Sequence, residues 1–328
     1  MKFDIGIIEN SSLPPCLNDF LTYLSTIKGK SQNTVNAYKV DIIMFFRFLK
    51  YYKGLCKVDI ELKEIDISDI DNKFLRSIRL SDLYAFISFT DKYRKNGTYA
   101  RARKVATLKS FFKYLNGKAK ILDENPAQEL ESPKISKRHP IYLTLNESKT
   151  LLTSLDESNK NYKRDFCILT LFLNCGLRVS ELCSINIDKI KEDTLTIIGK
   201  GNKERTVYLN RACLKAIADY IPMRNTEKVP IEDKNALFLT NKNTRISVRA
   251  IELLVKKHVK HSGIEKNNCT PHKLRHTAAT LMYKHGNVDI RSLQMILGHE
   301  NISTTQIYTH VDDETLRDAV KSNPLGDL

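Results

Sequence analysis

The chain has 328 residues and a mass of 37.7 kDa, which is more than one hydrophobic core usually organises, so we expect two domains. Lysine and arginine outnumber aspartate and glutamate by 53 to 38, and the net charge of +15 favours a polyanionic partner, although charge alone fits DNA, RNA, a ribosome or an acidic membrane surface. No apolar run approaches the roughly 20 residues that span a bilayer, and the N-terminus lacks a signal-peptide pattern, so we expect a soluble cytoplasmic protein without membrane association.

The first third of the chain is expected to be all-helical. Apolar residues recur at helical spacing over residues 31–50, with Ser31 placed as the N-cap, and further helices are predicted over about 81–93 and 98–115. The third helix carries basic residues that either follow a DNA backbone or form an ordinary solvated face. They are Arg101, Arg103, Lys104, Lys109 and Lys113.

A stretch rich in proline and basic residues, 131–140, shows little apolar periodicity, which is typical of an interdomain linker. The region beyond it is predicted to be mixed, mainly helical with a small sheet. Helices are expected over 144–155 and 165–173, followed by strands over 194–198 and 205–209 that a turn at 199–202 joins. Four more helices are expected: 247–261, 271–285, 290–297 and a short one that carries Tyr308.

Cysteine and histidine spacing gives little support for a metal site. The seven cysteines are scattered, odd in number and without a C-x-x-C pair, so neither a disulfide framework nor a zinc ribbon is indicated and most are expected to be buried thiols. His272 and His276 are four residues apart and Cys269 precedes them, but no fourth ligand is suitably spaced and Arg275 would lie beside the cation. We predict no metal and no other cofactor.

Residues suited to phosphodiester chemistry fall in five short segments of the second region: 175–182 (CGLRVSEL), 199–205 (GKGNKER), 271–276 (PHKLRH), 297–299 (LGH) and 306–310 (QIYTH). Without a metal, cations must hold the non-bridging phosphate oxygens, and the guanidinium groups of Arg178 and Arg275 suit that geometry. A phenol with a reference pKa of about 10 is a poor nucleophile at neutral pH. Tyr308 would therefore need nearby positive charge and a proton acceptor.

In this order and at this spacing, the five segments closely resemble the catalytic core of the tyrosine recombinase (phage integrase) family, most of all the bacterial Xer recombinases. The resemblance extends over nearly the whole chain and implies a mainly α fold. It implies a helical, SAM-like core-binding domain that binds DNA at residues 12–117, a linker at 118–138, an α+β catalytic domain with a small antiparallel sheet at 139–322, and a C-terminal tail at 323–328. The two domains would form a C-shaped clamp around DNA.

The same resemblance implies which residues are catalytic: Arg178, Lys200, His272, Arg275, His299 and Tyr308. Tyr308 would form a 3′-phosphotyrosyl link that stores the energy of the broken bond, so neither metal nor ATP is needed. His272 would be the general base, His299 a hydrogen-bond donor to the phosphate, and Lys200 the acid for the leaving 5′-oxygen. The family pattern makes His276 structural. Glu181 either orients Arg178 or is an ordinary surface carboxylate.

The implied function is site-specific recombination, in which a homo- or hetero-tetramer pairs two duplex DNA sites and exchanges strands through a Holliday junction. An Xer-like role would serve chromosome or plasmid dimer resolution, and so chromosome partition and cell division, with a partner recombinase or an activating protein. Only about 30 residues precede Ser31, so no separate arm-binding domain is expected. The alternatives are an integrase or excisionase of a mobile element, a type IB topoisomerase, and a DNA-binding regulator without catalysis.

Overall fold

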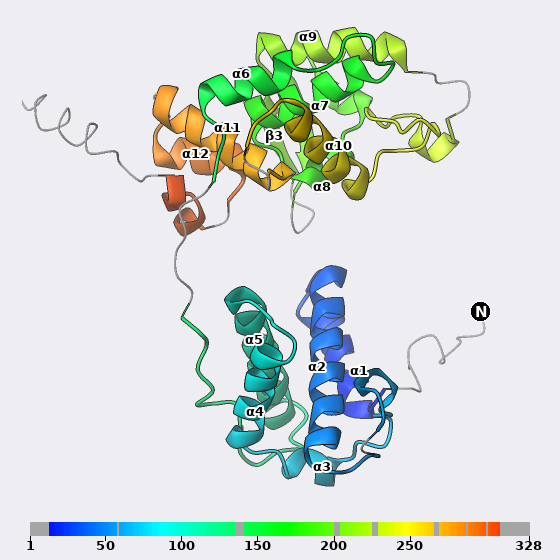
Figure 1. The fold of residues 1–328 in the computed structure, drawn as a ribbon, viewed down its shortest axis with the longest axis vertical. Coiled ribbons are helices and arrows are strands. Elements are labelled where there is room, and N and C mark those ends of the chain that lie inside the picture. Colours follow the sequence, from blue (N-terminus) through cyan, green and yellow to red (C-terminus); the bar gives the residue numbers. More distant parts are fainter. Residues whose placement is uncertain are drawn as a thin grey trace, which may run out of the picture. The chain divides into compact units, whose positions relative to one another are not determined.

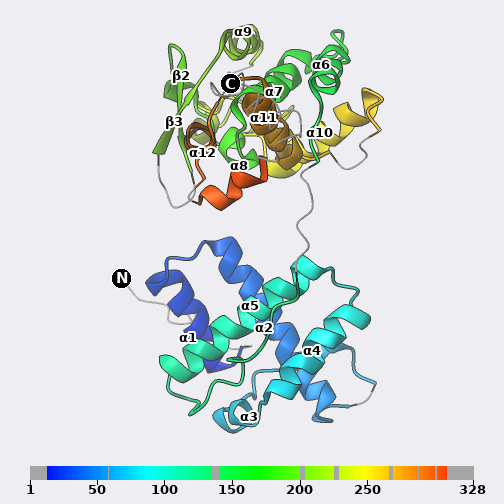
Figure 2. The ribbon, with the colours of Figure 1, turned by 90° about the vertical axis from the view of Figure 1, so that its left-hand side faces the viewer.

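Two units make up the chain, Met1–Lys137 and Arg138–Leu328 (Figures 1 and 2). The computed structural model describes residues 13–57, 59–134, 141–199, 204–224, 229–265, 269–286, 288–299 and 301–308. Each unit has its own hydrophobic core, as the length of the chain predicts. None of the described helices combines the length and apolarity needed to cross a membrane.

The described part of the first unit is helical. Its helices are α1 (Pro15–Thr22, continued by a π-helical turn, Tyr23–Ile27), α2 (Gln32–Tyr52), α3 (Asn72–Arg76), α4 (Leu80–Lys92) and α5 (Thr98–Gly117), with a 3-10 turn at Leu62–Glu64. The three predicted helices are confirmed as α2, α4 and α5, and the hydroxyl of Ser31 accepts the N-cap hydrogen bond from the Thr34 amide. The short α1 and α3 were not predicted.

Phenylalanine rings fill the core of the first unit. Phe45 on α2 contacts Phe86 on α4 edge to face, with ring centroids 5.2 Å apart, and contacts Phe112 on α5 in the same way at 6.0 Å. All three rings are fully buried. Edge-to-face pairs of this kind add to the free energy of burial, so these contacts fix the three predicted helices against one another.

The basic residues of α5 do not form one exposed face. Lys104 is buried and its Nζ lies 2.6 Å from Oδ1 of the buried Asp41 on α2. Arg103 contacts the same carboxylate, and Arg101 pairs with Asp91 over 2.7 Å. The predicted basic face is therefore wrong for Lys104, which ties α5 to α2 instead, while Lys109 and Lys113 are exposed.

The segment after α5 belongs to the first unit. Leu122, Ala127 and Leu130 are buried in its core, and the side-chain amide of Asn116 donates hydrogen bonds to the carbonyl oxygens of Leu122 and Asp123 at 3.0 and 2.9 Å. The predicted linker, 118–138, therefore began too early. Its loop residues lack a helical period, which concealed their burial. Residues 135–140 lie outside the described part of the chain.

The second unit combines helices with a small antiparallel sheet, as predicted. Its described elements are α6 (Leu145–Thr153), α7 (Tyr162–Cys175), α8 (Val179–Cys183), β1 (Ile190–Lys191), β2 (Thr194–Ile198), β3 (Glu204–Tyr208), α9 (Arg211–Tyr220), α10 (Val248–His261), α11 (Pro271–His285) and α12 (Ile290–Leu297), with 3-10 turns at Ile187–Lys189, Ile221–Met223, Ile231–Asp233, Ile302–Thr304 and Gln306–Tyr308. The order of the strands is β1-β2-β3, and Leu195 of β2 pairs with Val207 of β3 on the buried face. β1, α8 and α9 were not predicted.

Helix α7 is the centre of the second unit. Every residue from Cys167 to Leu173 is buried, so α7 has no exposed face over that stretch and packs against both α9 and α11 (Figure 2). A helix that is apolar on all sides is typical of a core. Its packing holds the end of α7, and residues 176–178 that follow it, against the start of α11, which carries residues 272–276. All seven cysteines are free thiols, and all except Cys56 are buried.

Candidate active site

Two glycines with positive φ angles end the helices that meet at the site. Gly176 ends α7 with a φ of 60°, and Gly298 ends α12 with a φ of 64°. Only glycine adopts this conformation without strain. The carbonyl oxygen of Gly176 accepts a hydrogen bond from Nη1 of Arg275 at 2.7 Å, and that of Gly298 accepts one from Nη2 of Arg178 at 2.9 Å.

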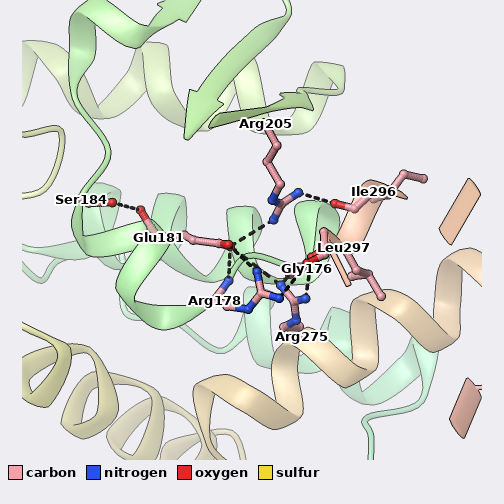
Figure 3. A network of polar contacts seen from close by, with 9 residues as sticks. Gly176, Arg178, Glu181, Ser184, Arg205, Arg275, Ile296 and Leu297 are labelled. Carbon is pink, nitrogen blue, oxygen red and sulfur yellow. Dashed lines mark hydrogen bonds and ion pairs between the residues drawn. The ribbon is translucent and has the colours of Figure 1, made fainter. Parts of the chain in front are cut away.

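Arg178 is held in place by Glu181 (Figure 3). Its Nη1 lies 2.7 Å from Oε1 of Glu181, and its backbone amide donates to Oε2 over the same distance, so both groups at the start of α8 use one carboxylate. The Arg178 side chain is 34% exposed, whereas that of Glu181 is 2% exposed. Of the two interpretations left open by the sequence, the surface carboxylate is wrong, and Glu181 orients Arg178.

Three arginines surround the Glu181 carboxylate (Figure 3). Besides Arg178, Nη2 of Arg205 on β3 lies 3.0 Å from Oε2, and Nη1 of Arg275 on α11 lies 3.8 Å from the same atom. Burial acts to raise the pKa of Glu181, but Arg205 and Arg178 outweigh it and hold that pKa below its usual value. With the carboxylate ionised, three guanidinium groups share one negative charge, and the cluster keeps an excess of positive charge.

Arg275 is the most deeply buried of these cations, with 4% of its surface exposed. Its two terminal nitrogens donate to the carbonyl oxygens of Gly176 and Leu297, both at 2.7 Å. Burial, with a further contribution from Arg178, lowers its pKa to about 10, so it still carries its charge at neutral pH. Two cations that repel each other in a partly dry site are stabilised by an anion placed between them.

Tyr308 lies in the 3-10 turn Gln306–Tyr308 and is almost fully buried. Its hydroxyl lies 2.6 Å from Nδ1 of His276 on α11. Burial raises the pKa of Tyr308 to about 12, although Arg275 acts in the opposite direction. The ring of His272 packs edge to face on His276, with centroids 4.4 Å apart, and burial lowers the pKa of His272.

His299 follows Gly298 and joins the same cluster. Its Nδ1 lies 3.0 Å from the hydroxyl of Thr305, and its carbonyl oxygen accepts a hydrogen bond from the Gln294 side chain at 2.9 Å. Burial, followed by Arg275 and Arg178, lowers the pKa of His299 to about 4. His299 is therefore neutral at physiological pH and feels the charge of both arginines.

The structure brings together five of the six residues predicted to be catalytic. They come from the α7–α8 junction (Arg178), α11 (His272 and Arg275), the residue after Gly298 (His299) and the last described turn (Tyr308). The sixth, Lys200, lies outside the described residues. No group of three or more histidine, cysteine, aspartate or glutamate side chains in the described ranges could hold a metal ion.

Sequence reasoning missed the part that two residues play in the site. Arg205 donates to Glu181 and to the carbonyl oxygen of Ile296, so it connects β3 with the end of α12. His276 was assigned a structural part, yet it is the described hydrogen-bond partner of the Tyr308 hydroxyl. A signal for Arg205 was available, because it is the last residue of the GKGNKER segment that contains Lys200.

Comparison with known proteins gives the same family. The family model "Phage integrase family" matches residues 142–315, and "Phage integrase, N-terminal SAM-like domain" matches residues 17–118. Tyrosine recombinase XerC of Caldanaerobacter subterraneus subsp. tengcongensis is 59% identical over 98% of this chain and 90% of that protein. Tyrosine recombinase XerD of Listeria monocytogenes serotype 4b is 34% identical over 93% of this chain and 97% of its own.

A solved structure shares the fold. The XerH site-specific recombinase, in a post-cleavage complex with palindromic difH substrate, is 20% identical to this chain with a TM-score of 0.71, over 95% of this chain and 99% of that one. The helical first unit and the mixed second unit match the order of domains in the two family models. The chain therefore belongs to the phage integrase family and is a DNA strand-exchange enzyme of the tyrosine recombinase type, most similar to the Xer recombinases.

Proposed function

We propose that this protein recombines DNA at specific sites by cutting and rejoining one phosphodiester bond per subunit through Tyr308. The observation that carries the proposal is the position of a buried tyrosine hydroxyl, hydrogen-bonded to a histidine, within the positive field of Arg275. Arg275 also repels Arg178, the second cation of the cluster. Glu181 balances one of the three positive charges, and a DNA phosphate supplies a further anion.

Each of the residues predicted to be catalytic has a part in this reaction. Arg178 and Arg275 hold the non-bridging oxygens of the scissile phosphate and stabilise the charge that develops in the pentacoordinate transition state. His272 and His299, which burial and the two arginines keep neutral, donate N–H hydrogen bonds to the phosphate. Lys200, which lies between β2 and β3 in the sequence, gives a proton to the leaving 5′-oxygen.

The reaction conserves bond energy. The Oη atom of Tyr308 forms a bond to phosphorus while the bond between phosphorus and the 5′-oxygen breaks, which leaves a 3′-phosphotyrosyl link. A 5′-hydroxyl from a second duplex reverses the step, so no ATP or metal is consumed. Two rounds of such exchange, made by four subunits on two sites, pass through a Holliday junction.

The similarity to proteins named XerC and XerD supports the Xer role among the alternatives. The function is then the resolution of chromosome or plasmid dimers in the cytoplasm, which serves chromosome partition at cell division. Because relatives carry both names, a hetero-tetramer with a partner recombinase fits this role. An integrase or excisionase of a mobile element would use the same chemistry on a different pair of sites.

Covalent trapping tests the proposal. Nicked suicide duplexes made from the source genome should yield a protein–DNA adduct at Tyr308, in EDTA as in magnesium, and peptide mapping by mass spectrometry locates it. Tyr308→Phe should give no adduct, while Tyr93→Phe, at an exposed tyrosine of the first unit, should behave as wild type. An adduct on another residue, or a strict need for a divalent metal, contradicts the proposal. The trapped sequences separate chromosomal sites from the ends of a mobile element.

Two further measurements separate catalysis from binding and recombination from relaxation. Arg178→Ala should abolish the adduct and leave DNA affinity nearly intact, with Arg211→Ala, at an exposed arginine on α9, as the matched control. An equal loss of affinity would make Arg178 a structural residue. A plasmid with two sites should be resolved into two circles, whereas relaxation of a plasmid without recombination would identify a type IB topoisomerase.

A further inference from the structure

The hydrogen bond between Tyr308 and His276 joins the nucleophile to a residue that the family pattern leaves without a chemical part. The hydroxyl oxygen lies 2.6 Å from Nδ1, and the ring centroids are 5.4 Å apart. His276 is on α11, one helical turn after His272 and directly after Arg275.

The direction of this hydrogen bond follows from the charge state of the two groups. Burial, followed by His272 and Arg275, lowers the pKa of His276 to about 4, so the imidazole is neutral at physiological pH. Burial raises the pKa of Tyr308 to about 12, so the phenol keeps its proton. Tyr308 therefore donates and Nδ1 accepts, which places the ring proton of His276 on Nε2.

We propose that His276 is a catalytic residue that takes the proton from Tyr308 during attack on the DNA phosphate and returns it when the phosphotyrosyl link is broken. This inference rests on the proposed function. As the Oη–P bond forms, the phenol proton passes to Nδ1 and His276 becomes an imidazolium. The bond between phosphorus and the 5′-oxygen breaks, and the leaving oxygen takes its proton from Lys200. In rejoining, the imidazolium returns its proton to Oη.

The arrangement of the two α11 histidines supports a division of labour. His272 interacts electrostatically with both Arg275 and Arg178, the two cations proposed to hold the phosphate. His276 interacts with His272 and Arg275 and contacts the tyrosine. The edge-to-face contact, with ring centroids 4.4 Å apart, fixes the orientation of each ring relative to the other. His272 is thus placed to contact the phosphate, and the general-base part that the resemblance gave it falls to its neighbour.

Bound DNA makes His276 a better proton acceptor. The charged or titratable groups that face His276 are His272, Arg275, Tyr308 and His299. With no phosphate present, the positive charge of Arg275 opposes a second cation on the ring. A phosphodiester held by the arginines offsets that charge and raises the affinity of Nδ1 for a proton. Proton transfer therefore accompanies bond formation, and the tyrosine stays protonated and unreactive until DNA is bound.

The test compares two kinds of proton-transfer defect in single-turnover cleavage by the full-length protein. His276→Asn keeps an oxygen acceptor close to the position of Nδ1 but removes the base. We expect it to form the Tyr308 adduct about 100-fold more slowly or worse, with DNA affinity unchanged. Replacing the leaving 5′-oxygen of the substrate with sulfur removes the need for an acid. Lys200→Ala should be rescued by that substrate, and His276→Asn should not.

A second measurement varies the acidity of the nucleophile. Without a base, the rate of His276→Asn should rise tenfold per pH unit, because attack then depends on the small phenolate fraction. A fluorinated tyrosine at position 308, which is more acidic, should accelerate His276→Asn strongly and wild type weakly. Strong acceleration of the wild type would show that a preformed phenolate attacks, and would overturn the inference without relying on the folding of the variant.

His285→Asn, at the exposed end of the same helix, is the matched control and should cleave at the wild-type rate. A His276→Asn rate within a few-fold of wild type, with the same pH profile, would reduce His276 to a positioning residue. Rescue of His276→Asn by the sulfur substrate would make it an acid. A wild-type protein that forms no adduct at Tyr308 on any duplex would overturn the proposed function as well, so the two failures are distinguishable.

Discussion

Arg205 donates a hydrogen bond from Nη2 to the buried carboxylate of Glu181 over 3.0 Å, which joins strand β3 to the helix that begins after Arg178. The same carboxylate binds Arg178 and lies 3.8 Å from Arg275. Glu181 therefore sets the separation of the two arginines proposed to hold the phosphate. The ion network therefore positions Arg178 and Arg275 as well as stabilising the second unit.

Glu181→Gln should destabilise the second unit and inactivate the enzyme. Loss of the charge leaves three neighbouring guanidinium groups without their carboxylate, at a cost of about 3 kcal/mol in the free energy of unfolding. A DNA phosphate would replace part of the lost charge, so DNA should raise the melting temperature of this variant more than that of the wild type. Thermal unfolding with and without duplex DNA measures both effects.

Glu252→Gln is the control for this prediction, because Glu252 is 45% exposed and pairs with Arg249, whose side chain is also exposed. Its stability should change by less than about 0.5 kcal/mol. If Glu181→Gln were as stable as wild type and cleaved DNA normally, the carboxylate would not organise the arginines.

Local sequence signals determine most of the helices. The predicted range 271–285 matches α11 residue for residue, because Thr270 caps the helix and Pro271 occupies its first position. The predicted range 290–297 matches α12, which lies between the N-cap Asp289 and Gly298. α8 has only five residues, too few to show a period, and was missed for that reason.

The contacts of the site could be predicted less well than its residues. Tyr308 and His276 are 32 residues apart, and Arg205 and Glu181 are 24 apart. Whether such side chains meet depends on how α12 and the turns after it pack on α11, which no local pattern encodes. The list of candidate residues was therefore available from the sequence motifs and the family that they resemble, whereas the hydrogen bond that suggests a proton acceptor required the fold.

The two kinds of lysine on α5 should respond differently to substitution. Lys104→Ala breaks a buried ion pair with Asp41 and should lower the free energy of unfolding by about 3 kcal/mol. Lys109→Ala, at an exposed position, should change stability by less than about 0.5 kcal/mol. If Lys109 contacts a DNA phosphate, its loss should reduce the slope of log affinity against log salt by about 0.9.

Urea unfolding and DNA titrations at several salt concentrations separate these outcomes. For a folded Lys104→Ala, we expect the wild-type salt slope. A reduced slope for that variant would mean that Lys104 leaves Asp41 to bind DNA, and the structural part assigned to it would be wrong.

Acid should destabilise the DNA-free enzyme through its buried histidines. Burial lowers the pKa values of His276 and His299 to about 4, from 6.5 for an unperturbed side chain. Between these two pH values the unfolded chain binds more protons than the folded one, so stability falls as pH falls from 6.5 to 4 and is unaffected by these groups above that window. Protonation of each histidine should lower the free energy of unfolding by roughly 1–3 kcal/mol.

Urea unfolding at pH 7 and pH 5, followed by circular dichroism, measures this loss. His276→Asn should show a smaller difference between the two pH values, because one of the two groups no longer titrates. An unchanged difference would show that other groups cause the acid sensitivity. Because DNA raises the proton affinity of these histidines, complex formation at pH 5 should also take up protons, which isothermal titration in buffers of different ionisation enthalpy detects.

Replacement of Gly298 should disable the site. With its φ of 64°, a Cβ atom would lie 2.8 Å from Cδ and 2.9 Å from Nε of Arg205. Gly298→Ala should therefore combine backbone strain of about 1 kcal/mol with displacement of Arg205, which binds Glu181.

Gly263→Ala is the matched control, because Gly263 has a φ of 70° and no atom within 4 Å of the added Cβ. Both variants should lose similar stability from strain, but only Gly298→Ala should lose cleavage of a suicide substrate, by at least about tenfold for a 1.4 kcal/mol loss of transition-state stabilisation. Equal cleavage by the two variants would show that Arg205 can move without disturbing Arg178. The contacts around the Glu181 carboxylate would then be less rigid than their short distances indicate.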